Sequence, residues 1–326
     1  MEYSSPDETA VHNLASAAVN TLIDEEDGTF DFEELRRITK LVTRNLDNVI
    51  DANYYPTERA RRSNLKHRPI GIGVQSMADT FAMLRYAFDS AEARELDVKI
   101  FENIYYAADE ASCELAKERG VYPSYEGSLG SQGKLQFDMR REEEGRKIET
   151  TLDRDKLKKE KMSKYSNHIS YLLVLIPTRS TAQILGNNES NKPFTNNTYT
   201  RKVISRFFNV ATRHLYKRLT KQGICSSGMG NFLATTRGSI QDIKGIDANT
   251  KLVFKTVWEI CQMSLVEMVT ARTPFVNQSQ LFNVYIDAST HSNVYAKVNA
   301  LHHRTSGKGL KTRLYYLRIR PGCNPV

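Results

Sequence analysis

A short apolar run that ends in a cluster of hydroxyl side chains constrains the fold of this chain more than any other feature. Residues 171–176 form the run, which predicts a buried strand. Pro177 closes it, and Thr178, Ser180 and Thr181 follow where a helix should begin. Hydroxyls and free backbone N–H groups at a helix start can hold a phosphate, although ordinary helix capping uses the same residue types. The segment therefore predicts a strand–turn–helix unit and leaves two interpretations of its turn open.

Long amphipathic segments on both sides of this unit predict helices. Apolar residues recur every three to four positions over 30–50 and over about 90–119, where Gly120 provides a natural C-cap. Strands that alternate with long helices are typical of an α/β fold. The other expected elements are helices at about 74–86, 153–165, 198–221, 250–271 and 291–303, and strands at about 281–286 and 312–319.

Two further segments are expected to be irregular. Gly71 and Gly73 flank an apolar turn, and without a third glycine and a preceding strand they form no dinucleotide-binding fingerprint. Residues 140–163 are the expected flexible insertion, because 140–147 is a dense run of charge with no apolar period.

The composition is that of a soluble globular protein and argues against two classes of partner. With 40% hydrophobic residues, the chain has no apolar run near the roughly 20 residues that span a bilayer, and its acidic start is unlike a secretory signal. We therefore expect a cytoplasmic protein without a membrane partner. The net charge is +8, but the basic runs at 59–62 and 156–164 lack the interleaved aromatic residues that stack on bases. A solvated helix surface is favoured over nucleic-acid binding.

The sequence contains no pattern of metal ligands or paired thiols. Cys113, Cys225, Cys261 and Cys323 are scattered and include no C-x-x-C pair, which fits reduced thiols better than disulfides or zinc. His12 has no neighbouring ligand at metal-binding spacing, so a hydrogen-bonded histidine is the simpler interpretation. No metal site is predicted.

The residues around the hydroxyl cluster resemble a known family. Residues 177–190, Pro-Thr-Arg-Ser-Thr-Ala-Gln-Ile-Leu-Gly-Asn-Asn-Glu-Ser, are similar to the substrate-phosphate turn of the class I ribonucleotide reductase large subunit. The resemblance covers nearly the whole chain and is weakest over 140–163 and 285–306. It implies one domain over 1–326, the later half of a ten-stranded α/β barrel akin to glycyl radical enzymes. Shorter matches follow in the family's order: Asn53–Pro56, His67–Gln75, Glu110–Glu118, Tyr125–Ser128, Asn277–Gln280, Gly309–Thr312 and Leu314–Arg318.

The resemblance also implies an activity and its partners. The family reduces ribonucleoside diphosphates to deoxyribonucleoside diphosphates for DNA synthesis, using thioredoxin-type reductants. A small subunit with a metal-tyrosyl centre supplies the radical, so this chain is expected to bind no cofactor itself. The resemblance assigns the substrate phosphate to Pro177, Thr178, Arg179, Ser180 and Thr181.

Tyr315 and Tyr316 match the family's tyrosine pair, which passes the radical to the catalytic cysteine. Without the resemblance, adjacent strand residues would face opposite sides, with one ring buried and the other exposed. Arg313 stands where the family has a glycine, and its side chain can crowd the pair.

Several matched positions carry different residues from the family. Arg179 replaces a small residue within the hydroxyl cluster; it could pair with phosphate or fill the substrate's space, and we expect loss of substrate fit. His168-Ile169-Ser170 stands in place of Arg-Asn-Ser, which removes a cation near the predicted strand. His12 takes the position of one redox cysteine, and a histidine cannot form a disulfide.

The family's remaining reactive thiols have no counterpart among these 326 residues. Its finger loop, Asn-Leu-Cys-x-Glu, would lie immediately before Met1, a second redox cysteine lies earlier still, and a tail cysteine pair would follow the matched end. The lone Cys323 cannot replace that pair. We therefore expect this polypeptide alone to be catalytically incompetent.

Three alternatives follow for the role of the chain. It is a piece of an active enzyme, or a non-catalytic paralogue that binds a full-length large subunit or the small subunit, or a basic nucleic-acid binder. The substitutions at His12, Arg179 and Arg313 favour a non-catalytic protein. Half a barrel also exposes strand edges, so the isolated chain is expected to be unstable or oligomeric.

Overall fold

The computed structural model describes residues 4–139, 150–153, 156–202, 207–225, 228–289 and 293–320. Its helices are α1 (Phe32–Ala52), α2 (Glu58–His67), α3 (Met77–Leu84), α4 (Ala91–Arg119), α7 (Ser163–Tyr165), α8 (Arg179–Leu185), α9 (Arg213–Lys221), α10 (Met229–Thr235), α11 (Ala248–Val253), α12 (Gln262–Arg272) and α13 (Val294–Gly307). Its strands are β1 (Asn13–Ala18), β2 (Ile23–Asp24), β3 (Thr29–Phe30), β4 (Ile70–Gln75), β5 (Thr198–Lys202), β6 (Phe207–Ala211), β7 (Asn283–Asp287) and β8 (Tyr316–Arg320).

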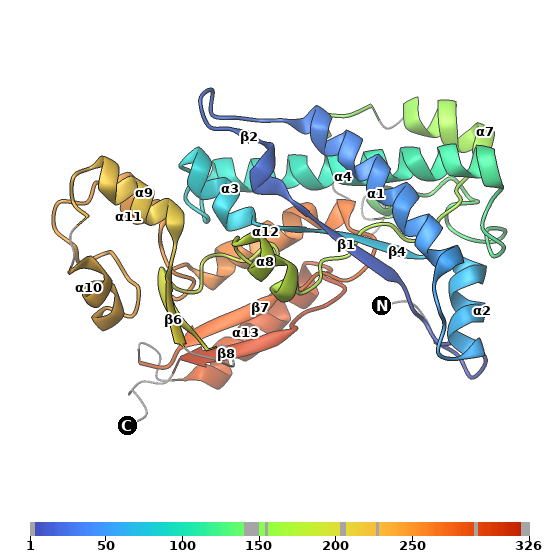
Figure 1. The fold of residues 1–326 in the computed structure, drawn as a ribbon. Helices are drawn as coiled ribbons and strands as arrows, with labels where there is room; N and C mark the ends of the chain where they lie inside the picture. The colour runs from blue at the N-terminus through green and yellow to red at the C-terminus, as the bar shows by residue number, and fades with distance from the viewer. Residues whose placement is uncertain are drawn as a thin grey trace.

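Helices α1 and α4 lie side by side along one face of the molecule (Figure 1). The Ser90 hydroxyl accepts a hydrogen bond from Ala93 N at 3.2 Å and begins α4, and Gly120, with φ of 86°, ends it. Lys40 of α1 pairs with Glu110 of α4 at 2.6 Å. Both helices follow the predicted apolar period, which confirms the expectations for 30–50 and 90–119.

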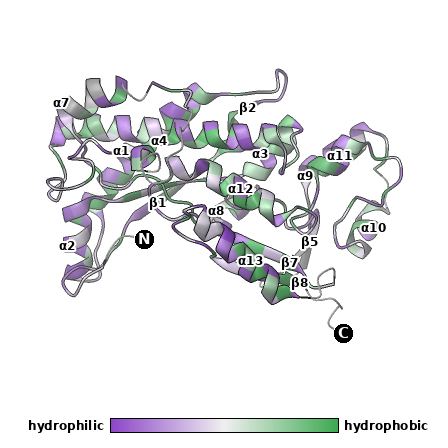
Figure 2. Ribbon diagram, turned by 180° about the vertical axis from the view of Figure 1, so that it is seen from behind, coloured by the Kyte–Doolittle hydropathy of each residue, from purple (hydrophilic) through white to green (hydrophobic). Residues whose placement is uncertain are grey.

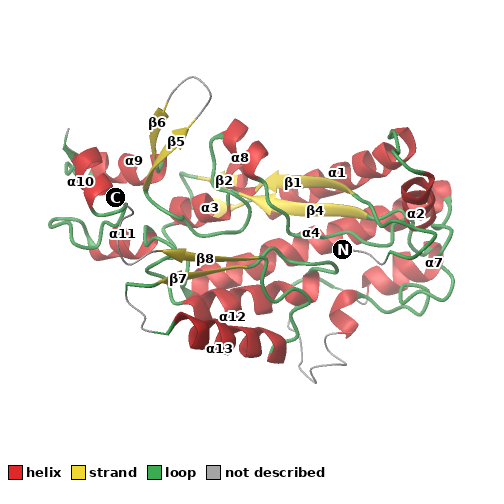
Figure 3. Ribbon diagram, turned by 90° about the horizontal axis from the view of Figure 1, so that it is seen from below, coloured by secondary structure: helices red, strands yellow, loops and turns green. Residues whose placement is uncertain are grey.

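The described strands form four two-stranded sheets, and none of them closes into a barrel. β1 pairs in parallel with β4, and β7 pairs in parallel with β8 (Figure 3). Between these pairs runs the segment predicted as a strand, residues 171–176. It is extended but forms only an isolated parallel bridge between Ile72 and Leu173 instead of a full strand, and Val174 N donates to Ile72 O at 3.1 Å. On its other side Leu281 N donates to Leu175 O at 3.0 Å. The expectation of a partial barrel is confirmed: the described strands form an open α/β arrangement covered by helices.

Hydrophobic residues concentrate in the middle of this arrangement. Figure 2 shows many apolar residues on α12, and β7 is buried along most of its length, whereas α2 is mainly hydrophilic. The core includes Phe81, Phe101 and Phe275, each at most 1% exposed. Within the described part of the chain, no helix combines the length and the apolar character needed to cross a membrane.

Three predicted elements differ from the structure. The segment around Gly71 and Gly73 is strand β4, not a turn. The helix predicted at 198–221 is an antiparallel β5–β6 hairpin followed by the short α9, because its first half is rich in β-branched and aromatic residues. The helix predicted at 250–271 is two helices, α11 and α12, separated by a turn. α2 was not predicted.

The expected insertion at 140–163 lies partly outside the described residues. Where the chain is described again, residues 157–162 form a π-type helical turn that continues into α7. Leu157 and Met162 are buried, at 1% and 6% exposed. The end of the segment is therefore packed against α4.

Gly73 is predicted to be intolerant of any side chain. A Cβ placed there would lie 2.8 Å from the carbonyl oxygen of Val174, which is backbone and cannot move aside. Gly73→Ala should lower the free energy of unfolding by about 1–3 kcal/mol in urea denaturation. Gly307→Ala is the control, because no atom lies within 4 Å of its new Cβ. An equal loss in both variants would contradict the prediction.

Candidate functional site

The predicted phosphate turn forms at the start of α8, after the extended segment. Thr178 precedes the helix, yet its side chain makes no capping hydrogen bond. Its hydroxyl instead accepts a hydrogen bond from Ser190 N at 2.8 Å, and the residue is 4% exposed. The Thr181 hydroxyl lies 3.1 Å from Gln75 Oε1. Both threonines therefore hold the turn together, while Arg179 and Ser180 are exposed.

A cavity of about 940 Å³ opens beside this turn. Of the five predicted phosphate residues, Arg179 and Ser180 line the cavity, whereas Pro177, Thr178 and Thr181 are not among its lining residues. The other walls come from α3, from the loop that follows α8, from the start of α9 and from β7 and β8. Segments far apart in sequence thus meet at one opening.

Asp79 of α3 joins two of these walls and was missed by sequence reasoning. It is 4% exposed, and its Oδ2 accepts a hydrogen bond from Asn188 N at 2.6 Å. Its Oδ1 lies 3.1 Å from Nε2 of His214 at the start of α9. The loop is further held by Ser76 N, which donates to Asn188 O at 2.9 Å. The available signal was an acidic residue within an otherwise apolar helix.

The cavity is electrostatically positive. Its cations are Arg179, Lys192, Arg213 and Arg318, and its carboxylates are Asp79 and Glu189. Burial lowers the pKa of Lys192, and the nearby Arg318 lowers it further, against the opposing effect of Glu189. A site of this charge suits an anion with several oxygens, because arginine can bind phosphate through two parallel hydrogen bonds.

The tyrosine pair is in contact and exposed. The Tyr315 and Tyr316 ring centroids are 4.5 Å apart, with the planes at 73°. The two residues are 45% and 53% exposed, so the arrangement expected without the family resemblance, with one ring buried, does not occur. Tyr315 precedes β8, where strand alternation does not apply. A hydrogen bond with the Tyr316 hydroxyl raises the pKa of Tyr315. Arg313 is also exposed.

The histidine and cysteines singled out from the sequence lie apart from the cavity lining. His12 is half-buried beside Gly71, at the entry to β1. Cys113 is buried in α4, Cys225 and Cys261 are exposed, and Cys323 lies outside the described residues. Among the residues with described positions, no group of three histidine, cysteine or acidic side chains is arranged to hold a metal ion.

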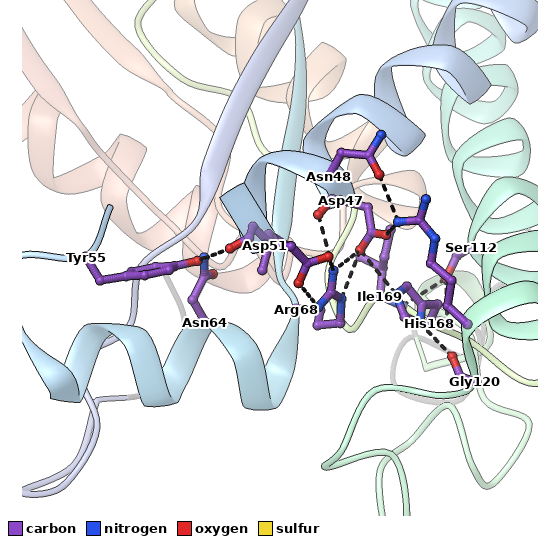
Figure 4. Close-up of polar contacts among 12 residues, drawn as sticks. Asp47, Asn48, Asp51, Tyr55, Asn64, Arg68, Ser112, Gly120, His168 and Ile169 are labelled. Carbon is purple, nitrogen blue, oxygen red and sulfur yellow. Dashed lines mark hydrogen bonds and ion pairs between the residues drawn. The ribbon is translucent and has the colours of Figure 1, made fainter. Parts of the chain in front are cut away.

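A second polar cluster surrounds Asp47, where α1, α2 and α4 meet (Figure 4). Asp47 is fully buried and accepts hydrogen bonds from Arg68 at 2.7 Å and from Arg119 at 2.7 Å. His168 lies in this cluster, with Nδ1 2.5 Å from Gly120 O and Nε2 3.3 Å from Asp47. The substitution at 168, predicted to weaken the phosphate region, therefore falls in a structural network.

Comparisons with known proteins agree with this architecture. Residues 1–316 match the family described as ribonucleotide reductase, barrel domain. The chain is 48% identical over 326 residues to a ribonucleoside-diphosphate reductase large subunit of Caenorhabditis elegans, and 46% identical to that of Danio rerio. Each match covers 100% of this chain and 40% of the relative.

A solved structure shows the same fold. The class Id ribonucleotide reductase alpha subunit of Actinobacillus ureae superposes with a TM-score of 0.74 at 23% identity, over 97% of this chain and 51% of that one. The likeness shows that the described chain has the fold of part of that subunit. The chain belongs to the ribonucleotide reductase large-subunit family and spans 40% of the length of the curated relatives named above.

Proposed function

We propose that these residues form the nucleoside-diphosphate-binding part of a ribonucleoside-diphosphate reductase large subunit. The observation that carries the proposal is the cavity beside α8, where Arg179 and Ser180 lie among cations from other segments. Its volume of about 940 Å³ is sufficient for a nucleotide. The relatives are ribonucleoside-diphosphate reductase large subunits, which supplies the proposed class of reaction, the reduction of a ribonucleoside diphosphate.

Each residue of the turn has a distinct role in this proposal. The hydroxyl of Ser180 and the guanidinium of Arg179 contact the phosphates, because both side chains reach the cavity. Thr178 and Thr181 shape the turn through their bonds to Ser190 N and Gln75. No described carboxylate lies within ion-pair distance of Arg179, which supports phosphate pairing over the loss of substrate fit expected from the sequence.

The tyrosine pair is the proposed contact with a small subunit. Tyr315 and Tyr316 touch through their rings and are both accessible, as a pair that exchanges a radical with another chain must be. We assign to the small subunit the supply of that radical and to this chain its relay. A deoxyribonucleoside diphosphate would be the product.

A second candidate is a non-catalytic chain that binds and regulates a full-length large subunit or the small subunit. One observation favours it: no cysteine is found among the described residues that line the cavity. In the family, a cysteine thiyl radical removes a hydrogen from the ribose, and no closed-shell side chain can do so. On this ground we propose that residues 1–326 alone do not reduce a nucleotide.

Cytidine diphosphate should bind the purified chain, and Arg179→Gln should weaken that binding about tenfold. Loss of one charge-assisted hydrogen bond costs about 1.5–3 kcal/mol, which corresponds to at least this factor. Isothermal titration calorimetry measures the dissociation constant. Arg61→Gln, an exposed arginine of α2 away from the cavity lining, is the matched control. Equal affinity in both variants would contradict the role of Arg179.

An activity assay tests the proposed absence of nucleotide reduction. With a small subunit, cytidine diphosphate and dithiothreitol, we expect no deoxycytidine diphosphate from the chain alone. Formation of deoxycytidine diphosphate would contradict the non-catalytic candidate. Co-purification of a small subunit or a full-length large subunit would support it, and failure to associate at micromolar concentration would count against it.

A further inference from the structure

Asp79 places a negative charge in a cavity that we propose binds phosphate. The residue is buried and belongs to the cavity lining. A carboxylate repels an anion, so direct contact with the ligand does not explain its position. Both of its oxygens have partners in the protein: Oδ2 accepts from Asn188 N at 2.6 Å, and Oδ1 lies 3.1 Å from His214 Nε2. From α3, Asp79 thus contacts two other walls of the cavity.

The first of these walls is the loop that follows α8. Both backbone polar groups of Asn188 are bonded, because Ser76 N donates to its carbonyl oxygen at 2.9 Å while Asp79 accepts from its N–H. Its Nδ2 in turn donates to Lys192 O at 2.6 Å. Asn188 and Lys192 both line the cavity. Asp79 therefore fixes the backbone of the wall beside the phosphate turn.

The second wall is the first turn of α9. The His214 side chain is 11% exposed and lies outside the cavity lining. A ring nitrogen 3.1 Å from a carboxylate oxygen carries a proton, so His214 Nε2 donates to Asp79. The same nitrogen cannot then accept from Arg213 Nε, which lies 3.4 Å away. Because Arg213 lines the cavity, this donor is available to a ligand.

The pair of Asp79 and His214 gives α9 a directional tie to α3. The buried Leu215 and Leu219 also hold α9, but apolar packing is non-directional. Lys217 pairs with Glu25 in the turn between β2 and β3, yet both side chains are about half exposed, at 53% and 52%. An exposed ion pair contributes little, so the buried carboxylate fixes where α9 begins.

We propose that Asp79 is a positioning residue of the cavity. Through Asn188 and His214 it holds the loop after α8 and the first turn of α9 at the separation at which Arg213 and the phosphate turn bind the same diphosphate. The proposal rests on the proposed function of the cavity and names what keeps its cationic walls in place. It also predicts a sign: removal of a carboxylate that merely lined the cavity would strengthen anion binding, whereas removal of a positioning residue weakens it.

Calorimetry with cytidine diphosphate measures this sign. Asp79→Leu removes the charge and both acceptors, and it should weaken binding about tenfold, because each wall loses a hydrogen bond to a charged group. His214→Leu alters a residue outside the lining and should also weaken binding about tenfold. His214→Gln should stay within about twofold of the unaltered chain, because its amide can donate from the place of Nε2.

His67→Leu is the matched control. His67 Nε2 also lies close to a carboxylate, at 2.8 Å from Glu8 Oε2, but α2 is at the opposite end of the molecule from α9 (Figure 1). This variant should bind cytidine diphosphate as the unaltered chain does. Urea denaturation establishes that each variant is folded under the conditions of the titration. The two His214 variants carry the test by themselves if Asp79→Leu does not fold.

Three results would overturn the positioning role: binding by Asp79→Leu that is equal or tighter, an equal loss in His214→Gln and His214→Leu, or an equal loss in His67→Leu and His214→Leu. Each of these leaves the proposed function intact, because the unaltered chain still binds the nucleotide. If the unaltered chain binds no cytidine diphosphate, the proposed function fails and the positioning role fails with it.

Discussion

Arg272→Met should lower the free energy of unfolding by about 3–5 kcal/mol, because it leaves a buried carboxylate without its cation. Arg272 of α12 is 1% exposed and donates from Nη1 to Asp97 of α4 at 2.8 Å. Its Nε donates to Gln280 at 2.9 Å, and its guanidinium packs over the Phe101 ring. The pair joins two helices, and both side chains are buried, so bulk solvent cannot replace the lost charge.

The same two helices supply a matched control. Arg94 and Glu267 form an ion pair at 2.9 Å between α4 and α12, but the two side chains are 34% and 45% exposed. Glu267→Gln should cost less than about 1 kcal/mol, since water replaces the lost partner. Urea denaturation at pH 7 measures both variants. If Arg272→Met costs no more than Glu267→Gln, burial does not set the strength of this interaction.

The pH dependence of Asp97 gives this prediction a second measurement. Burial raises the pKa of Asp97 to about 6, although Arg272 acts in the opposite direction. A carboxyl group with a raised pKa contributes its stability at low pH and loses that contribution as pH rises through about 4 to 6. Removal of Arg272 leaves only the raising effect, so the deficit of Arg272→Met should be smaller at pH 5 than at pH 8.

Asp47→Asn should also destabilise the protein by about 3–5 kcal/mol at pH 7. The Asp47 carboxylate is the common partner of Arg68, Arg119 and His168, and none of it is exposed. An amide of the same shape removes the charge and leaves the guanidinium groups of Arg68 and Arg119 without their shared carboxylate. Asp51→Asn is the control, because Asp51 contacts the same Arg68 at 2.8 Å yet is 53% exposed. Chemical denaturation should show a loss of less than about 1 kcal/mol there.

Acid should abolish the effect of Asp47→Asn. Burial alone would raise the pKa of Asp47, but hydrogen bonds from His168 and Arg68 outweigh it, and the pKa is lowered. A lowered carboxyl pKa contributes stability above the ordinary value, near 3.9, and this contribution is lost as pH falls through the folded value. The difference between the unaltered chain and Asp47→Asn should therefore be full at pH 7 and decline below about pH 4. A constant difference down to pH 3 would exclude a charge effect.

The elements that were predicted correctly depend on local interactions. The helices α1 and α4 were predicted because apolar residues recur every three to four positions. Their backbone hydrogen bonds join residues only four positions apart, so both helices depend on local sequence. Strand β4 was missed because its six residues are all buried, and the segment therefore lacks the alternation of apolar and polar residues that predicts a strand. The β5–β6 hairpin was read as a helix because short segments carry too few periods to separate the two patterns.

The candidate site was only partly predictable for a similar reason. Ser180 was identified from the hydroxyl-rich turn and Arg179 from the family resemblance, and both line the cavity. Asp79, Lys192 and Arg318 come from segments that meet only in the folded chain, and no local pattern connects them. The pairing of Asp79 with His214 spans more than one hundred residues of sequence.

By itself the sequence determined the family, the two long helices and the location of the hydroxyl-rich turn, because each depends on a pattern of residues that are close together in the chain. Only the tertiary structure decided the partners of three side chains: Thr178 and Thr181 form hydrogen bonds within the protein, and His168 lies in the Asp47 cluster. It also decided that four cations line one cavity. Burial and long-range packing create these features, since they determine which groups lose water and which charges are brought together.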